Sequence, residues 1–253
     1  MINNNAAARA WLAEHADLAE NELPSNITSL VLMERGLTEL PEWIGQLSSL
    51  TKLDVSYNHL GASILPESIG QLSSLTDLNL AVNGLTTLPE SIGQLSSLTD
   101  LDLGGNRLTG LPESTGQLSS LKVLKLNANK FTVLPEFIGQ LSSLTELVLF
   151  NNPLSVLPES IGRLRSLTRL RFGSPQLTTL PECIGQLTSL SKLEIAGNQF
   201  TTLPESIGKL SSLTELHIGN NQLTSLPESI GQLTSLVKLH LRNNKLSTLP
   251  ESI

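Results

Sequence analysis

Four arginines within nine residues stand in the stretch RLRSLTRLRFGSP, at residues 163–175. They are Arg163, Arg165, Arg169 and Arg171, half of the chain's eight. A guanidinium group presents five N–H donors in a planar fork that matches the oxygens of a carboxylate or phosphate. Phe150 comes shortly before them, and an exposed aromatic flanked by charge is a typical anchor for a protein partner. These residue types point to binding of an anionic group.

The sequence supports metal binding and nucleophilic catalysis less well than it supports anion binding. Glu194, His217 and His240 recur at steps of 23 residues and could approach one metal ion, but three ligands without a visible second shell favour ordinary polar contacts. Cys183 is the only cysteine, which excludes an internal disulfide and a CxxC zinc site. The sequence holds no HExxH motif, no nucleophile with a placed base and no glycine-rich phosphate loop. We therefore predict a protein that is not an enzyme, with no metal and no cofactor.

A repeat must position these side chains. Ten units begin at residues 27, 50, 75, 98, 121, 144, 167, 190, 213 and 236, with a step of 23 residues and one step of 25, where HLGASILPE holds a two-residue loop insertion. In the unit LTELVLFNNPLSVLPESIGRLRS, Leu147 and Leu149 alternate with other side chains, as in a short strand with one buried face. LPESIGRL then predicts a turn and a short helical or 3-10 segment. One unit cannot bury enough apolar surface alone, so stacked units must share a parallel sheet and a leucine core.

The pattern LxxLxLxxNxL, seen in LTDLNLAVNGL (75–85) and LTELHIGNNQL (213–223), resembles the leucine-rich repeat. The LPxxIGxL units are similar to those of Ras-suppressor proteins, Roco-type GTPases, plant intracellular Ras-group repeat proteins and bacterial effectors. The resemblance covers roughly residues 23–253. It implies an α/β solenoid shaped as a horseshoe or arc, with a parallel concave sheet, short helical or 3-10 convex segments, and partners that usually bind the concave face.

The asparagine of this pattern has a structural explanation. Its amide can satisfy backbone groups left unpaired where each strand ends in a turn. We expect a structural ladder of Asn58, Asn83, Asn106, Asn129, Asn152, Asn198, Asn221 and Asn244. Pro175 stands at the corresponding position of the seventh unit, where we expect Ser174 to supply one hydrogen bond.

The outward positions of the strands differ between units, whereas LPESIGQLSSL recurs with few changes. Two explanations fit this contrast. Either binding selects for variation on the concave face, or turn and cap requirements hold the convex residues constant and leave only the strands free to vary. Along the units the outward residues pass from acidic through apolar to basic. Solvent or a basic partner or cation would relieve the crowded aspartates at one end. The predicted partner-binding residues are Asp54, Asp77, Asp100, Asp102, Lys125, Val148, Phe150, Arg169, Arg171, Lys192, Glu194, His217 and His240.

The two ends differ. Residues 5–20 have apolar side chains at helical spacing, among them Trp11, Leu12 and Leu18, so we assign residues 1–26 to an N-terminal helical cap and residues 27–253 to the solenoid. The chain ends at STLPESI without a polar cap. An uncapped end predicts either a piece of a longer protein or end-to-end self-association of two chains.

The net charge of -7 argues against nucleic acid as a partner, and we find no signal peptide and no membrane span. The single cysteine favours a cytoplasmic location. If the protein is a bacterial effector, we expect it to be delivered into a host cell. We predict a non-enzymatic module that binds a protein partner through its concave face. The alternative is a targeting arm of a larger enzyme or effector, such as a GTPase, kinase or ubiquitin ligase, whose catalytic part lies outside this chain.

Overall fold

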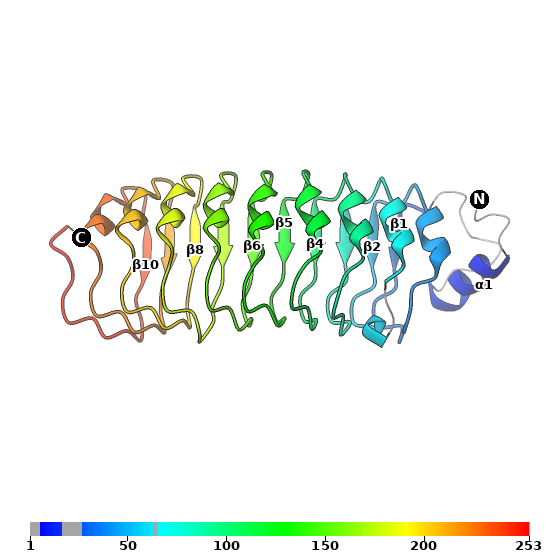
Figure 1. The fold of residues 1–253 in the computed structure, drawn as a ribbon, viewed down its shortest axis with the longest axis horizontal. Helices are drawn as coiled ribbons and strands as arrows, with labels where there is room; N and C mark the ends of the chain where they lie inside the picture. Colours follow the sequence, from blue (N-terminus) through cyan, green and yellow to red (C-terminus); the bar gives the residue numbers. More distant parts are fainter. Residues whose placement is uncertain (1–5, 17–26, 63–64, 253) are drawn as a thin grey trace. The chain divides into compact units, whose positions relative to one another are not determined.

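A computed structural model describes residues 6–16, 27–62 and 65–252. The chain forms two compact units, residues 1–123 and 124–253. The division falls inside one strand, β5 (Val123–Lys125). Within each unit the strands form one row and the five-residue 3-10 helices another, whereas the short helix η3 (Leu60–Ala62) of the first unit lies apart from that row (Figure 1).

The first unit begins with helix α1 (Ala6–His15). Besides part of β5, its strands are β1 (Ser29–Val31), β2 (Lys52–Asp54), β3 (Asp77–Asn79) and β4 (Asp100–Asp102). Its 3-10 helices are η2 (Glu42–Gln46), η3 (Leu60–Ala62), η4 (Glu67–Gln71), η5 (Glu90–Gln94) and η6 (Glu113–Gln117). Strands β1 to β4 pair in parallel and in chain order. The additional helix η3 belongs to the sequence repeat that contains the predicted two-residue insertion. Residues 63 and 64 of that repeat lie outside the described residues.

The second unit repeats this plan. Its further strands are β6 (Glu146–Val148), β7 (Arg169–Arg171), β8 (Lys192–Glu194), β9 (Glu215–His217) and β10 (Lys238–His240). Its 3-10 helices are η7 (Glu136–Gln140), η8 (Glu159–Arg163), η9 (Glu182–Gln186), η10 (Glu205–Lys209) and η11 (Glu228–Gln232). Strands β6 to β10 are parallel neighbours in chain order. The predicted parallel strands and 3-10 segments are thus confirmed.

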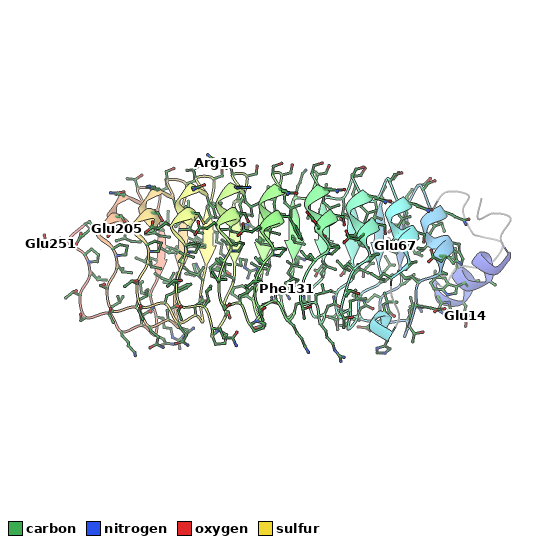
Figure 2. All side chains as sticks on the ribbon, in the orientation of Figure 1. Glu14, Glu67, Phe131, Arg165, Glu205 and Glu251 are labelled. Carbon is green, nitrogen blue, oxygen red and sulfur yellow. The ribbon has the colours of Figure 1, made fainter. Side chains whose placement is uncertain are left out.

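The aliphatic positions of the repeat form the core. The middle residue of each strand is a leucine, and Leu53, Leu101, Leu147 and Leu193 are at most 1% exposed. Three phenylalanines take leucine positions of the second unit and are fully buried: Phe131, Phe172 and Phe200. Phe131 accordingly lies inside the ribbon in Figure 2. The two outer residues of each strand point away from this core, because side chains alternate along a strand, and they make up what we call the outward face.

A tight turn follows nearly every strand. In nine of the ten units, the residue just before the ladder position has a positive φ, as in Asn151 (57°), Gly197 (77°) and Asn220 (54°). Glycine and asparagine adopt this left-handed conformation most readily. Tyr57 and Val82 occupy the same position with φ of 57° and 55°. The seventh unit, with Ser174 and Pro175, is the exception among them.

Successive 3-10 helices pack closely enough to require glycine. A Cβ atom on Gly139 would lie 2.6 Å from the carbonyl oxygen of Ser160 in the next turn, and one on Gly208 would overlap the carbonyl oxygen of Ser229. Any larger residue would push the two turns apart. The glycine of LPxSIG therefore sets the distance between neighbouring repeats.

Helix α1 contacts the first repeat through its aromatic side. Leu12 is fully buried, and the Trp11 ring lies 5.4 Å from that of Trp43 in an edge-to-face arrangement. The helix is shorter than the predicted residues 5–20, since Ala16 is a bend and Leu18 lies outside the described residues. The assignment of residues 1–26 as a cap stays a prediction. In the described ranges, no helix combines the length and apolar character that crossing a membrane requires.

Candidate functional site

The outward face of the second unit carries a continuous set of ion pairs. Arg171 Nε donates to Glu194 Oε2 at 2.7 Å, and Lys192 Nζ reaches the other oxygen of Glu194 at 2.7 Å. Lys192 also lies 3.4 Å from Glu215, which accepts from Lys238 Nζ at 2.6 Å. We call these five residues, from β7 to β10, the charge ladder.

The ladder shifts the ionisation of its carboxylates. Burial raises the pKa of Glu194, but hydrogen bonds from Lys192 and Arg171 outweigh it and hold that pKa below its usual value. The hydrogen bond from Lys238, supported by Lys192, lowers the pKa of Glu215 to about 2. Both carboxylates therefore stay charged at neutral pH, and the ladder is intact there.

These ion pairs lower the net positive charge that the arginine cluster presents. The sequence pattern predicts a basic end, but the ladder and the Glu146–Arg169 pair set four cations against three carboxylates, which leaves a single excess positive charge. Arg169 is the least constrained cation of the group, because its Nη1 lies 3.7 Å from Glu146 and 59% of its side chain is exposed. The outward face here is mixed in charge, and Arg169 is its most accessible cation.

Arg171 also covers the predicted aromatic anchor. The carbon of its guanidinium lies 5.4 Å from the centre of the Phe150 ring, within cation–π range. Phe150 is half-buried, so part of the ring is available to a partner. Val148 is only 6% exposed and so contributes little to the expected apolar surface. Lys125, another predicted contact residue, is half-buried.

A shallow depression of about 350 Å³ lies beside this pair. It is lined by Glu146, Arg169, Arg171, Ser191, Lys192, Thr214 and Glu215. Arg163 and Arg165 are exposed but do not belong to this lining; Arg163 ends η8, and Figure 2 shows Arg165 at the edge near the 3-10 helices. The four arginines of the cluster thus divide into two that line the depression and two that do not.

The asparagines occupy buried sites at the strand ends. Asn152 donates to the carbonyl oxygens of Leu126 and Leu149 at 2.9 Å each and accepts from the Phe131 N–H at 3.2 Å. Asn221 repeats this geometry with donations to Ile195 and Ile218. All eight asparagines of the predicted ladder are positioned at the strand-end turns, and seven of them are at most 6% exposed.

The seventh unit replaces this arrangement with a different turn. Pro175 is exposed, while Ser174 is fully buried and donates its hydroxyl to the carbonyl oxygen of Leu154 at 2.7 Å. The Ser174 N–H donates in turn to Asn198 Oδ1 at 2.9 Å. A serine hydroxyl therefore makes the one substitute hydrogen bond that the sequence suggests, and the proline contributes no ladder contact.

The aspartates of the first unit each have a local partner. Asp77 and Asp100 stand opposite each other on β3 and β4, and each accepts a hydrogen bond from the threonine hydroxyl just before it, at 2.6 and 2.7 Å. Asp54 accepts from Ser56 and from the Asn79 amide. Asp102 accepts from the Gly104 N–H at 3.0 Å. These hydroxyl, amide and backbone N–H donors partly offset the repulsion between neighbouring carboxylates.

The two histidines of the second unit lie against each other with their rings tilted by 31°. The rings of His217 and His240 are 4.2 Å apart, and burial, followed by the charge of His240, lowers the pKa of His217. His217 Nε2 lies 3.5 Å from Glu215 Oε2 without forming a hydrogen bond. Across the described residues, no group of three histidine, cysteine, aspartate or glutamate side chains is arranged to hold a metal.

Cys183 occupies a serine position on η9 and is 5% exposed. Burial, with a contribution from Glu159, raises the pKa of its thiol to about 11. Since the thiolate is the nucleophilic form, this cysteine is chemically quiet at neutral pH.

The uniform side of the repeat is held by structural contacts. Glu67 Oε2 accepts the N–H of Ser91 in the next turn at 3.1 Å, and Glu136 does the same for Ser160 at 3.2 Å. Together with the glycines described above, these contacts explain why the glutamate and the glycine of PESIG recur. The constancy of these positions therefore follows from packing, and the variation of the outward face is not by itself a sign of selection for binding.

Three family profiles match the chain. One, described as a leucine-rich repeat region, matches residues 75–152 and 112–199. Two others, both described as leucine-rich repeats, match residues 188–246 and 49–72. No curated protein matches the sequence as a relative.

Several solved structures share the fold. The leucine-rich repeat domain of the type III effector XCV3220 (XopL) is 26% identical with a TM-score of 0.74, over 94% of this chain and 81% of that one. The functional domain of InlJ from Listeria monocytogenes is 25% identical with a TM-score of 0.70, over 84% of this chain. The plant peptide hormone receptor RGFR1, in complex with RGF2, is 29% identical with a TM-score of 0.55, over 88% of this chain.

The chain spans only 43% of the InlJ chain and 46% of the RGFR1 chain. Repeating leucines, parallel three-residue strands, buried strand-end asparagines and the family matches agree: the chain belongs to the leucine-rich repeat family, whose fold commonly mediates protein–protein interaction.

Proposed function

We propose that this chain binds a protein partner through the outward face of its second unit, the face that the sequence predicts to be concave. The observation that carries the proposal is the Arg171–Phe150 pair: a half-buried aromatic ring under a guanidinium whose Nε–H is fixed by Glu194 at 2.7 Å. Arginine and aromatic residues dominate the energetic centres of protein interfaces. Such a pair needs little ordering when a partner arrives, because it is already held in place.

Arg171 has hydrogen-bond donors that are available to a ligand. Arg171 uses its Nε–H on Glu194, and within the described residues it makes no other hydrogen bond, so the four N–H groups on its two terminal nitrogens can engage a ligand. Arg169, with 59% of its side chain exposed, lines the same depression. A carboxylate seated there would receive charge-assisted hydrogen bonds from both arginines.

The expected partner therefore presents a carboxylate next to an apolar group. The carboxylate would enter the depression of about 350 Å³, and the apolar group would pack on the open part of the Phe150 ring. A stable interface covers about 800 Å² per partner, so these contacts form its centre and the flanking polar residues of the strands form its rim. The aspartates of the first unit stay a separate prediction from the sequence, as contact residues for basic groups.

A matched pair of double variants tests this proposal. Phe150→Ala with Arg171→Glu removes the anchor, whereas Phe137→Ala with Arg163→Glu makes the same chemical changes on η7 and η8, away from the outward face. We expect both variants to fold, as judged by circular dichroism. Proteins captured from a lysate by the wild type should be lost with the first variant and kept with the second. Equal capture by both would show that the partner binds elsewhere.

A cytoplasmic location, and the role of a targeting arm for a larger enzyme, remain predictions from the sequence. The relatives with solved structures include a type III effector and a peptide hormone receptor, so the fold serves in more than one setting. The family consists typically of non-catalytic interaction modules, and our proposal follows that use.

A further inference from the structure

A groove of about 660 Å³ lies in the first unit, where three successive strand-end turns meet. The turns follow β2, β3 and β4, and they contribute Tyr57, His59, Val82, Gly84, Gly105 and Arg107, together with Gly61 and three ladder asparagines. These residues differ from those of the outward face, so the groove is independent of the proposed Arg171–Phe150 anchor.

Two of its residues are held in an unfavourable conformation. Tyr57 and Val82 have φ of 57° and 55°, in the left-handed region that costs a non-glycine residue roughly 1–2 kcal/mol. For a β-branched residue such as Val82 this is a genuine outlier. Glycine or asparagine fills the same turn position in five other repeats, as at Gly105 and Asn220, while Glu34 and Ala128 share the positive φ without a large apolar side chain.

Burial does not offset this cost. Tyr57 is 50% exposed and Val82 is 40% exposed, so neither gains much from the core. Two neighbouring apolar side chains are thus kept at the surface, at positions where the repeat itself offers less strained choices. Backbone strain of this kind at the surface is characteristic of binding sites.

The groove has an open floor. A Cβ atom on Gly84 would meet no atom within 4 Å, so the space above this residue is empty. A Cβ on Gly105 would lie 2.8 Å from Val82 Cγ2, which shows that the valine side chain leans over Gly105. The three turns are about 4.8 Å apart, which gives a length of roughly 10 Å, the span of about three residues of extended chain.

The groove carries one formal positive charge although the chain is negative. Arg107 is the only charged residue in its described lining, which includes no aspartate or glutamate, while the whole chain has a formal charge of -7. In the preceding turn, Glu34 and Arg35 are both exposed and their charges oppose each other. An anionic ligand would therefore find a complementary site here.

We propose that this groove binds a short extended segment of a partner protein that carries a carboxylate next to an aliphatic side chain. The aliphatic group packs against Tyr57 and Val82 above Gly84, and the carboxylate pairs with Arg107. The strained valine is retained because it forms the apolar wall of this site.

Tyr57 makes the test specific, because it is the only tyrosine in the chain. Growth with 3-fluorotyrosine places a single fluorine reporter in the groove of the 253-residue chain. Titration with the tetrapeptide acetyl-DLDL-amide should shift its NMR signal in a saturable way. The amide analogue acetyl-NLNL-amide, and the Arg107→Gln variant with the original peptide, should each bind about tenfold more weakly, as expected for loss of one charged hydrogen bond.

Val82→Asn tests the link between strain and binding, since asparagine is the residue that other units use at this position. We expect it to raise the urea midpoint of the first unit, followed by the fluorescence of Trp11 and Trp43, and to weaken peptide binding about tenfold. Ala128→Asn, at the same turn position in the second unit, should leave peptide binding unchanged. A lower midpoint for Val82→Asn, no saturable shift with acetyl-DLDL-amide, or equal binding of the two peptides would overturn the proposal.

Discussion

Replacing Asn152 by alanine removes one rung of the asparagine ladder at a site where its contacts are complete. The side chain is 2% exposed, donates to Leu126 and Leu149 at 2.9 Å each and accepts from the Phe131 N–H at 3.2 Å. At about 1 kcal/mol of net stability for each hydrogen bond, the three bonds together contribute about 3 kcal/mol. Because these groups stay buried in the variant, water cannot replace the lost partner without distorting the turn.

Hydrogen exchange of the Phe131 amide measures this loss directly. A decrease of about 3 kcal/mol in the free energy of opening should speed exchange at this amide by about a hundredfold, if opening of the second unit controls it. The guanidinium midpoint followed by circular dichroism should fall as well. Asn151→Gly is the matched control: Asn151 is exposed, has φ of 57° and tolerates glycine, so exchange at Phe131 should change little. A loss below 1 kcal/mol in the Asn152→Ala variant, or an equal loss in both, would refute the ladder argument.

Three further predictions concern single residues. Thr115 occupies an isoleucine position, is fully buried and has a hydroxyl without a hydrogen-bond partner among the described residues, so Thr115→Ile should raise the free energy of unfolding by roughly 1–2 kcal/mol in urea titrations. Cys183, whose thiol pKa is raised from 9.0 to about 11, should react with Ellman's reagent at pH 8 about a hundredfold more slowly in the folded chain than in urea; equal rates would contradict its burial. The lowered pKa of His217 means that the unfolded chain takes up a proton first as pH falls past 6.5. Stability should therefore drop as pH falls through 6.5, and His217→Asn should reduce that drop in urea midpoints.

Much of the fold follows from the repeat, because each unit has the same physical problem to solve. Leu147 and Leu149 alternate with outward side chains, and in the structure Leu147 lies in strand β6, Leu149 directly follows that strand, and both are buried in the leucine core. The asparagine positions are readable for the same reason: equivalent turns leave equivalent backbone groups unpaired. The replacement of Asn by Ser174 and Pro175 could be located in the sequence, and the buried hydroxyl of Ser174 gives it a structural basis.

The candidate site was less predictable, because the charge at one position says nothing about how far a side chain reaches. Arg171, Lys192 and Lys238 are long enough to meet carboxylates on neighbouring strands, so the expected basic end became a nearly balanced ladder. Val148 is another case, since an outward position on a strand can still be covered by its neighbours.

The strained turns were hidden for a different reason. A sequence contains no φ values, and Tyr57 and Val82 are expected from the sequence to be ordinary surface residues. The signal that could have found them is the comparison of one turn position across the units, where glycine and asparagine predominate in the second half of the chain. An apolar residue at a position that favours glycine is a reason to look for a ligand.

Site-specific photo-cross-linking tests the central claim, that a partner contacts the outward face of the second unit. A photoreactive amino acid replaces Arg169, whose exposed side chain lines the depression beside Arg171, or Ser189, an exposed residue on the loop after η9. We expect a partner cross-link from position 169 that disappears when Phe150→Ala and Arg171→Glu are added, and no such product from position 189. A cross-link that survives the double variant, or that forms equally from both positions, would contradict it.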